Sequence, residues 1–241
     1  MFFWREQDEL LDRGFTQRLG GVSEGAYAGL NLGARVGDSP GHVTENRARL
    51  ATSLGIDPGR LLFMDQCHGS DVAVAEGPWA DGVPPAADAL VTAVPGLALC
   101  VLVADCSPVL LADRERGVVA AVHAGRPGMV AGVVPAAVEA MRDIGAQDIE
   151  AVVGPSVCGR CYEVPIEMRE AAAAVSRESR TVSWTGTAAI DVAAGVVAQL
   201  RDEKVSVTWV SGCTREDERL FSYRRDGQTG RTAGVVLLRH A

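Results

Sequence analysis

Three side chains that bind transition metals, His68, Cys106 and His123, each end a strand-like segment of the sequence. Small residues follow both histidines, Gly69-Ser70 in one case and Ala124-Gly125 in the other. Glycine beside a functional side chain lets backbone or ligand approach closely. If the three strands are neighbours, two imidazoles and one thiolate converge. That donor set suits zinc with one coordination position left open.

The same three donors permit other chemistry. They are compatible with copper. They also permit catalysis without metal, in which Cys106 attacks as a nucleophile and His68 or His123 serves as its base. In a purely structural interpretation, Cys106 is a core thiol and the histidines are hydrogen-bonded loop residues. The wide spacing, unlike that of a zinc finger, does not choose among these possibilities.

A second group of candidate residues is the C-x-x-C motif from Cys158 to Cys161. Such a motif can mark a redox pair or half of a zinc site. No second C-x-x-C and no nearby histidine completes it, and it lies in a loop rich in glycine and proline. The sequence therefore favours a structural role for this segment.

The remaining cysteines are not expected to take part in chemistry. Cys67 adjoins His68, and adjacent residues on a strand point to opposite faces, so it is expected as a bystander. Cys100 is expected in the core, and Cys213 is compatible with a core position. Disulfides are rare in a reducing cytoplasm, so free thiols are expected throughout.

Arginines at loop positions form another candidate cluster. Arginine is the usual partner of phosphate or carboxylate because its planar fork donates two parallel hydrogen bonds. Arginines beside glycine-rich turns in an acidic chain indicate a local anion pocket. The residues concerned are Arg18, Arg47, Arg126, Arg224, Arg225 and Arg231.

Composition excludes several classes of partner. The 241 residues carry a net charge of −8 and only 5% aromatic residues, which argues against nucleic acid and against anionic lipid. The N-terminus lacks the order of a signal peptide, and no apolar run reaches the ~18 residues of a membrane span. The longest apolar run, 97–111, contains Asp105. We therefore expect a cytoplasmic protein.

The elements that must position these residues alternate irregularly. Helices are predicted from Ser39-Pro40 to Gly55 and over 130–144, 167–177 and 191–201. Strands are predicted over 61–64, 71–75, 89–93, 98–103, 109–112, 117–123, 149–153 and 205–210, with a turn over 124–128 and two strands within 220–238. Several strand pairs lack an intervening helix, which favours a mixed α+β or layered α/β design. No G-x-G-x-x-G follows a strand, and no Walker loop occurs.

Taken together, ordered motifs through nearly the whole chain resemble the YfiH/YlmD family, also called laccase-domain or multicopper polyphenol oxidase-like proteins. The resemblance rests on the following segments: Thr16-Gln17-Arg18, Gly20-Gly21-Val22-Ser23, Leu30-Asn31-Leu32-Gly33, Val36-Gly37-Asp38, Asn46-Arg47, Gln66-x-His68-Gly69, Ala104-Asp105-Cys106-x-Pro108, His123-Ala124-Gly125, Gly154-Pro155, Tyr162-Glu163-Val164, Ser222-Tyr223-Arg224-Arg225-Asp226-Gly227 and Thr229-Gly230-Arg231.

The resemblance implies a single domain over residues 1–241 with a layered α/β/β/α sandwich of mixed sheets. It implies zinc held by His68, Cys106 and His123. It also implies activity on purine nucleosides, either phosphorolysis of adenosine, inosine or methylthioadenosine, or deamination of adenosine. The older family label is copper-dependent oxidation of phenols, and some relatives are linked to peptidoglycan editing.

The resemblance further assigns roles around the metal. Arg47, with Arg18, is expected to orient phosphate, and Asp105 to carry a proton or to accept from a metal-bound histidine. Asn31, Asn46 and Arg126 are expected to bind substrate or phosphate. The chain departs from the family after His123-Ala-Gly, where Arg126-Pro127-Gly128 replaces the usual Trp-Arg-Gly. An aromatic surface is lost there.

We therefore predict a zinc-dependent purine nucleoside enzyme of the phosphorylase or adenosine deaminase type. Its partners are a small nucleoside and phosphate, without nucleic acid or membrane, in a monomer or small homo-oligomer. One alternative is a copper-dependent polyphenol oxidase, which is weakened because the chain has four histidines and no H-x-H pair. Another is a non-catalytic cell-wall or assembly factor that retains the metal site.

Overall fold

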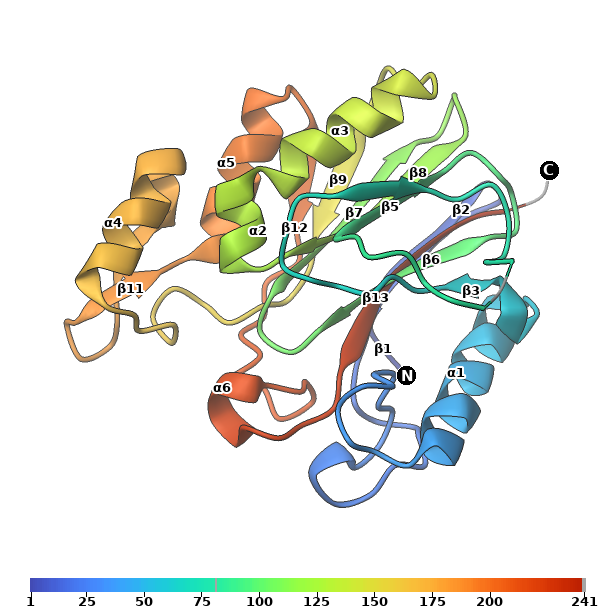
Figure 1. Cartoon of the computed structure of the whole chain (residues 1–241), viewed down its shortest axis with the longest axis horizontal. Helices are drawn as coiled ribbons and strands as arrows, with labels where there is room; N and C mark the ends of the chain where they lie inside the picture. The colour runs from blue at the N-terminus through green and yellow to red at the C-terminus, as the bar shows by residue number, and fades with distance from the viewer. Residues whose placement is uncertain (81, 240–241) are drawn as a thin grey trace.

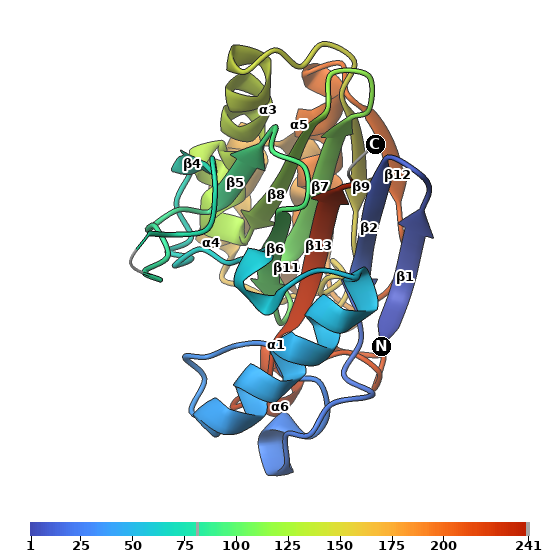
Figure 2. The ribbon, with the colours of Figure 1, turned by 90° about the vertical axis from the view of Figure 1, so that its right-hand side faces the viewer.

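The first of two large sheets has five strands in the order β1-β2-β13-β6-β3. The protein is described by a computed structural model that covers residues 1–80 and 82–239. The strands are β1 (Phe2–Gln7), β2 (Leu11–Thr16), β13 (Thr232–Leu238), β6 (Ala98–Val103) and β3 (Leu61–Leu62). Neighbours run antiparallel except β3 and β6, which are parallel. Elements from both ends of the chain thus share one sheet (Figure 2).

The second large sheet has six strands in the order β12-β9-β7-β8-β5-β4. They are β12 (Ser206–Trp209), β9 (Glu150–Val153), β7 (Ser107–Asp113), β8 (Val118–Ala124), β5 (Ala89–Thr92) and β4 (Val72–Val74). The pairs at both edges are parallel and those in the middle are antiparallel. A separate two-stranded hairpin pairs β10 (Arg180–Val182) with β11 (Ala188–Ile190).

The two large sheets pack face to face because alternate apolar side chains point between them. Leu99 and Val236 from the first sheet share a fully buried cluster with Leu110 and Ala121 from the second. The alternating residues of the second sheet, such as Leu111, point to the opposite face and join a different cluster. Each large sheet therefore buries both of its faces.

Helices cover the outer faces of the sandwich (Figure 1). On the first sheet, α1 (Pro40–Leu54) places Leu50 against the outward residues of β6 and β13. On the second, α2 (Arg126–Ala131), α3 (Val133–Asp143), α4 (Ile166–Val175) and α5 (Val192–Asp202) contribute to one apolar cluster with the strands. The remaining helices are α6 (Tyr223–Asp226) and the short 3-10 turns Gly25–Tyr27, Pro58–Arg60 and Arg177–Ser179. The predicted α/β/β/α sandwich with mixed sheets is confirmed.

The prediction of two strands within 220–238 is wrong in its first half. Residues Tyr223–Asp226 form the one-turn helix α6, and only β13 is a strand. Ser222 explains the difference, because its side chain accepts a hydrogen bond from the backbone N–H of Arg225 and so caps the helix. Local capping therefore overrides the strand pattern.

The predicted helix over 130–144 and the turn over 124–128 are also corrected. Gly132 adopts φ 86°, the left-handed conformation that glycine tolerates, and separates α2 from α3. The first of these helices begins inside the predicted turn, at Arg126, because a proline in the first turn needs no amide hydrogen.

Within residues 1–80 and 82–239, no helix has the length and apolar character needed to span a bilayer. The cytoplasmic location and the single domain over 1–241 stay predictions, and residues 81 and 240–241 lie outside the described part of that range.

Candidate functional site

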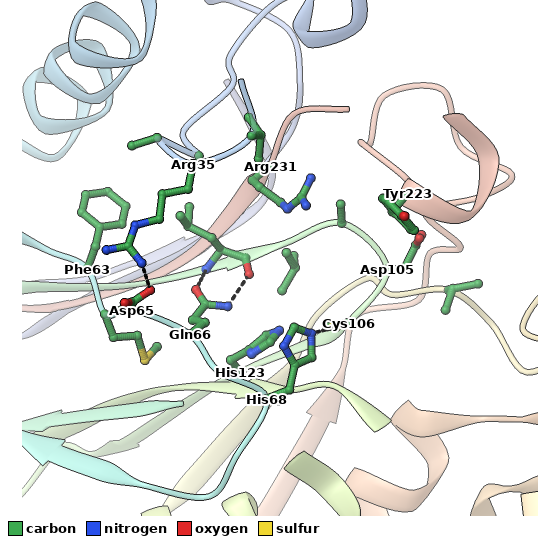
Figure 3. Close-up of a pocket in the computed structure, with 18 of the residues that line it drawn as sticks. Arg35, Phe63, Asp65, Gln66, His68, Asp105, Cys106, His123, Tyr223 and Arg231 are labelled. Atoms are coloured by element: carbon green, nitrogen blue, oxygen red, sulfur yellow. Dashed lines mark hydrogen bonds and ion pairs between the residues drawn. The ribbon is translucent and has the colours of Figure 1, made fainter. Parts of the chain in front are cut away.

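The three predicted metal donors meet where the chain passes between the two sheets. His68 lies in the segment from β3 to β4, Cys106 in the segment from β6 to β7, and His123 near the end of β8. Their donor atoms all lie within 4.8 Å of one another, and Cys106 Sγ is 3.8 Å from His68 Nε2. The two imidazole rings lie next to each other in Figure 3. They meet edge to face, with their centroids 4.7 Å apart.

Asp88, which was not predicted from the sequence, accepts hydrogen bonds from both histidines. Its Oδ1 accepts a 2.7 Å hydrogen bond from Nδ1 of His123, so Nε2 is the ring nitrogen that can bind metal once it has lost its proton. The same buried carboxylate accepts from the backbone N–H groups of His68 and Gly69, at 3.0 and 2.6 Å. Its only sequence signal is its position directly before the buried strand β5.

Electrostatics favour charged forms of this cluster. Burial alone would raise the pKa of Asp88, but hydrogen bonds from His123, Cys67 and Gly69 hold it well below its usual range. Burial also opposes the charged form of Cys106, yet His123 and His68 lower its pKa to about 6. The pKa of His123 rises to about 9 against burial because Cys106 and Asp88 surround it. Cys106 is therefore ready to bind a cation as thiolate.

One member of the cluster and one residue beside it adopt backbone conformations that are rare outside glycine: His68 at φ 63° and Asp105 at φ 97°. The Asp105 carboxylate accepts hydrogen bonds of 2.6 Å from Thr214 Oγ1, Ser222 Oγ and the backbone N–H of Arg224. These bonds fix the turn that presents Cys106. Asp105 thus anchors the turn, and the acceptor on His123 is Asp88.

Gly125 shows how closely the backbone approaches the donors. A Cβ atom at this position would lie 2.9 Å from His68 Cδ2 and 3.0 Å from Cys106 Sγ. Either contact requires a shift of the cluster, so only glycine fits without rearrangement.

A pocket of about 760 Å³ opens beside the donors. This volume is in the range of small-molecule sites. His68, Cys106 and His123 lie in its wall, and Arg231 reaches toward its centre in Figure 3. Its other principal side chains are arginines and aromatics: Arg35, Arg47, Arg126, Arg224, Arg231, Phe63, Tyr162 and Tyr223.

Four of these arginines form no ion pair within residues 1–80 and 82–239: Arg47, Arg126, Arg224 and Arg231. Arg47 donates from Nε and Nη2 to the carbonyl of Leu32 and stacks on Phe63, with its guanidinium carbon 3.8 Å from the ring centroid. Arg126 Nε is buried and has no hydrogen-bond partner among the residues that the structure describes. Burial lowers the pKa of both Arg47 and Arg231. Uncompensated cations in a pocket favour an anionic ligand.

Other predicted ligand-binding residues lie outside this pocket wall. Arg18 lies over the Phe221 ring, 4.8 Å from its centroid. Asn31 and Asn46 are fully buried, and their amides are occupied with neighbouring loop groups. Arg225 donates to the carbonyls of its own loop. In this structure these four residues organise the loops around the pocket.

Fold and site together define a layered α/β/β/α protein with a His₂Cys cluster beside an arginine-lined pocket. A family model described as multi-copper polyphenol oxidoreductase laccase matches residues 12–239. The chain therefore belongs to this laccase-domain family, the YfiH/YlmD proteins.

Relatives and solved structures agree with this assignment. The chain is 58% identical over 228 residues to a purine nucleoside phosphorylase of Streptomyces coelicolor, covering 93% of this chain and 94% of that protein. It is 40% identical over 228 residues to the purine nucleoside phosphorylase YfiH of Shigella flexneri, covering 92% of each. The crystal structure of YlmD from Geobacillus stearothermophilus superposes with a TM-score of 0.89 at 28% identity, covering 99% of both chains.

Proposed function

We propose that this protein is a purine nucleoside phosphorylase that holds zinc at His68, Cys106 and His123. The observation that carries the proposal is that the guanidinium groups of Arg47, Arg126 and Arg231, in the wall of the same pocket, form no ion pair within residues 1–80 and 82–239. A phosphate co-substrate supplies the anion that these groups lack. We infer the nucleoside substrate from the similarity of the chain to purine nucleoside phosphorylases.

The donor set fits zinc. Two imidazoles and one thiolate are borderline to soft ligands, and three protein donors leave a fourth position for substrate, as in catalytic zinc sites. For Zn–N of about 2.0 Å and Zn–S of about 2.3 Å, tetrahedral donors lie roughly 3.5 Å apart, and Cys106 Sγ lies 3.8 Å from His68 Nε2. Asp88 supplies the carboxylate acceptor that metal-bound histidines usually have. A zinc ion held there would supply Lewis-acid activation at its open position.

The chain's own residues divide the remaining tasks in phosphorolysis. A phosphate oxygen forms a bond to the anomeric carbon while the bond from that carbon to the purine nitrogen breaks, and the purine leaves with the bonding electrons. Arg126 and Arg231 orient the phosphate, and this positioning removes most of the entropic cost of a bimolecular step. Tyr223, which is 63% exposed on the pocket wall, offers a face on which a base can stack.

Deamination of adenosine is a second candidate, and the open position of the His₂Cys donor set favours it, because hydrolytic zinc sites share that arrangement. In this reaction water adds to the ring carbon that bears the amine, and ammonia leaves. The arginines have no assigned partner in deamination, so phosphorolysis accounts for more of the pocket.

The test is incubation of metal-analysed protein with adenosine and with inosine, each with and without phosphate, followed by chromatography. Free base and ribose 1-phosphate that appear only with phosphate support the phosphorylase. Inosine formed from adenosine without phosphate supports deamination instead. The absence of turnover by protein that carries stoichiometric zinc would overturn both. Oxidation of a phenol by copper-loaded protein alone would establish the oxidase alternative.

A further inference from the structure

Two similar turns lie outside the pocket wall and face each other. The first is the C-x-x-C segment Cys158–Cys161, and the second runs from Cys213 to Glu216. Each is closed by a backbone hydrogen bond from its fourth residue to its first, 2.9 Å from Cys161 and 3.1 Å from Glu216. Each turn therefore presents a potential metal ligand at both of its ends. The second turn supplies the partners for the C-x-x-C that were not found from the sequence alone.

The two turns are held in register by backbone pairing. Ser156 forms a parallel bridge with Cys213, with hydrogen bonds from Ser156 N to Gly212 O at 3.3 Å and from Thr214 N to Ser156 O at 3.1 Å. This pairing brings the three sulfur atoms and a Glu216 carboxylate oxygen within 4.8 Å of one another. Four donors from segments about fifty residues apart thus form one compact group.

We propose that Cys158, Cys161, Cys213 and Glu216 form a second zinc site, one that is structural. Tetrahedral zinc needs four donors, and thiolate sulfurs at about 2.3 Å from the ion lie roughly 3.8 Å apart. The observed group needs only a small contraction to reach that arrangement. Because all four ligands come from the protein, the site leaves no position for substrate. Closed sites of this kind are structural.

The surroundings of the group are those of a metal-bound thiolate. The backbone N–H of Cys158 points at Cys213 Sγ at 3.4 Å, a donor that stabilises negative charge on sulfur. Trp184 Nε1 lies 3.3 Å from Glu216 Oε1 and orients that carboxylate. Each turn also carries an arginine as its third residue, Arg160 and Arg215. Four anionic ligands around a divalent cation leave a net negative charge, which these arginines offset.

The proposed second zinc site lies next to the loop that carries Cys106. The backbone N–H of Val157, the residue before Cys158, donates to the carbonyl of Asp105 at 2.9 Å. From the second turn, Thr214 Oγ1 donates to the Asp105 carboxylate at 2.6 Å. Asp105, which directly precedes Cys106, is therefore hydrogen-bonded both by the residue before the first turn and by a residue of the second turn. Tyr162 of the pocket wall directly follows Cys161. The second zinc would fix two loops that shape the catalytic pocket, and this inference stands whatever reaction the pocket performs.

The experiment separates the two sites by metal content. The His68→Ala/Cys106→Ser double variant removes the first site, and the matched Cys213→Ser variant removes the second. Each is purified with a reductant, passed over a desalting column, and analysed for zinc by mass spectrometry. We expect about two zinc ions per wild-type chain, and about one per chain in each variant. A double variant that contains no zinc would overturn the proposal.

A measurement on the wild-type chain avoids dependence on a variant that fails to fold. Maleimide labelling with peptide mapping is carried out on zinc-loaded and chelator-stripped protein. Zinc should protect Cys158, Cys161 and Cys213 at least tenfold, whereas the fully buried Cys100 should stay unlabelled in both states and so report that the chain remains folded. Equal labelling of the three thiols in both states contradicts the site, as does a disulfide among them in protein prepared with reductant. Glu216→Gln, a near-isosteric change at an exposed position, should weaken zinc retention without unfolding the chain.

Discussion

The molecule holds two clusters of metal-binding side chains, and they differ in almost every physical respect. The first consists of His68, Cys106 and His123, three donors beside a pocket of about 760 Å³. The second consists of three thiols and a carboxylate on two paired turns. The first contains two imidazoles, which bind metal as neutral ligands, whereas all four donors of the second bind it as anions.

This difference shows how one type of metal ion could have a catalytic role in the first cluster and a structural role in the second. An open coordination position among three donors lets a substrate bind the metal, whereas four protein donors complete its coordination. The residues that surround the two clusters differ in the same sense. A buried carboxylate, Asp88, orients the first cluster, while Arg47, Arg126 and Arg231 in the pocket wall form no ion pair with any other residue that the structure describes. In the second, arginines lie within the ligand-bearing turns themselves, as Arg160 and Arg215 do.

Replacing one cysteine ligand in each cluster should change turnover or thermal stability more than any other substitution considered. Cys106→Ala removes a donor from the open site, so turnover should fall by more than the ~100-fold typical of losing an outer partner of a metal ligand. Cys158→Ala removes a donor from the closed site, and it should lower the melting temperature while turnover at low temperature stays within about tenfold of wild type. Steady-state kinetics and thermal melts on both variants provide the comparison. Equal loss of turnover in the two would contradict the assignment of open and closed roles.

Asp88→Asn tests whether the open cluster depends on its buried carboxylate. The asparagine keeps the size of the side chain but loses the charge that orients His123 and accepts from three backbone amides, those of Cys67, His68 and Gly69. Zinc affinity should fall roughly 10–100-fold, the usual cost of losing such a partner. Competition with a chromogenic chelator measures it, and Asp71→Asn, at a nearby exposed carboxylate, is the control. Unchanged affinity in Asp88→Asn would show that the carboxylate only supports the loop.

Arg126→Gln tests the anion side of the open cluster. Hydrogen bonds to charged groups contribute about 1.5–3 kcal/mol, which corresponds to a rise of roughly 10–150-fold in the KM for phosphate. The KM for nucleoside should change much less. Phosphate-dependence curves measure both, and Arg201→Gln on the exposed face of α5 is the matched control. If both variants behave alike, phosphate does not bind at Arg126.

The sequence predicted the open cluster better than the closed one, and the reason is physical. His68, Cys106 and His123 each lie in or after a segment of strand character, and the resemblance to the family implied that they share one metal site. Cys213 and Glu216 lie on a turn whose pairing with the C-x-x-C turn depends on a backbone bridge to Ser156. Nothing in local periodicity encodes that bridge.

Long-range hydrogen bonds explain the other failures. The carboxylate of Asp88 serves a histidine 35 positions away, and no pattern in its own neighbourhood signals this. Asp105 likewise accepts from Ser222 across the chain, and the same serine caps the helix that replaced a predicted strand. In contrast, the helix over Pro40–Leu54 was predicted closely because proline and glycine mark its ends locally.

The smallest expected effect needs no substitution and contrasts the two clusters without metal. A thiol reacts as thiolate, and its lowered pKa of about 6 means that Cys106 is protonated only below that pH. Between pH 7 and 9 its rate of alkylation in metal-free protein should therefore rise by only about a tenth, whereas the rate for an ordinary thiol would rise roughly 25-fold. Burial, together with neighbouring Cys158 and Cys213, raises the pKa of Cys161 to about 12, so that thiol should stay protonated and slow over the same range. Peptide-resolved alkylation rates with iodoacetamide measure both, after correction for the intrinsic reactivity of each thiolate. A steep rise for Cys106 would mean that the two imidazoles do not stabilise its thiolate, and the electrostatic contrast between the open and the closed cluster would then be lost.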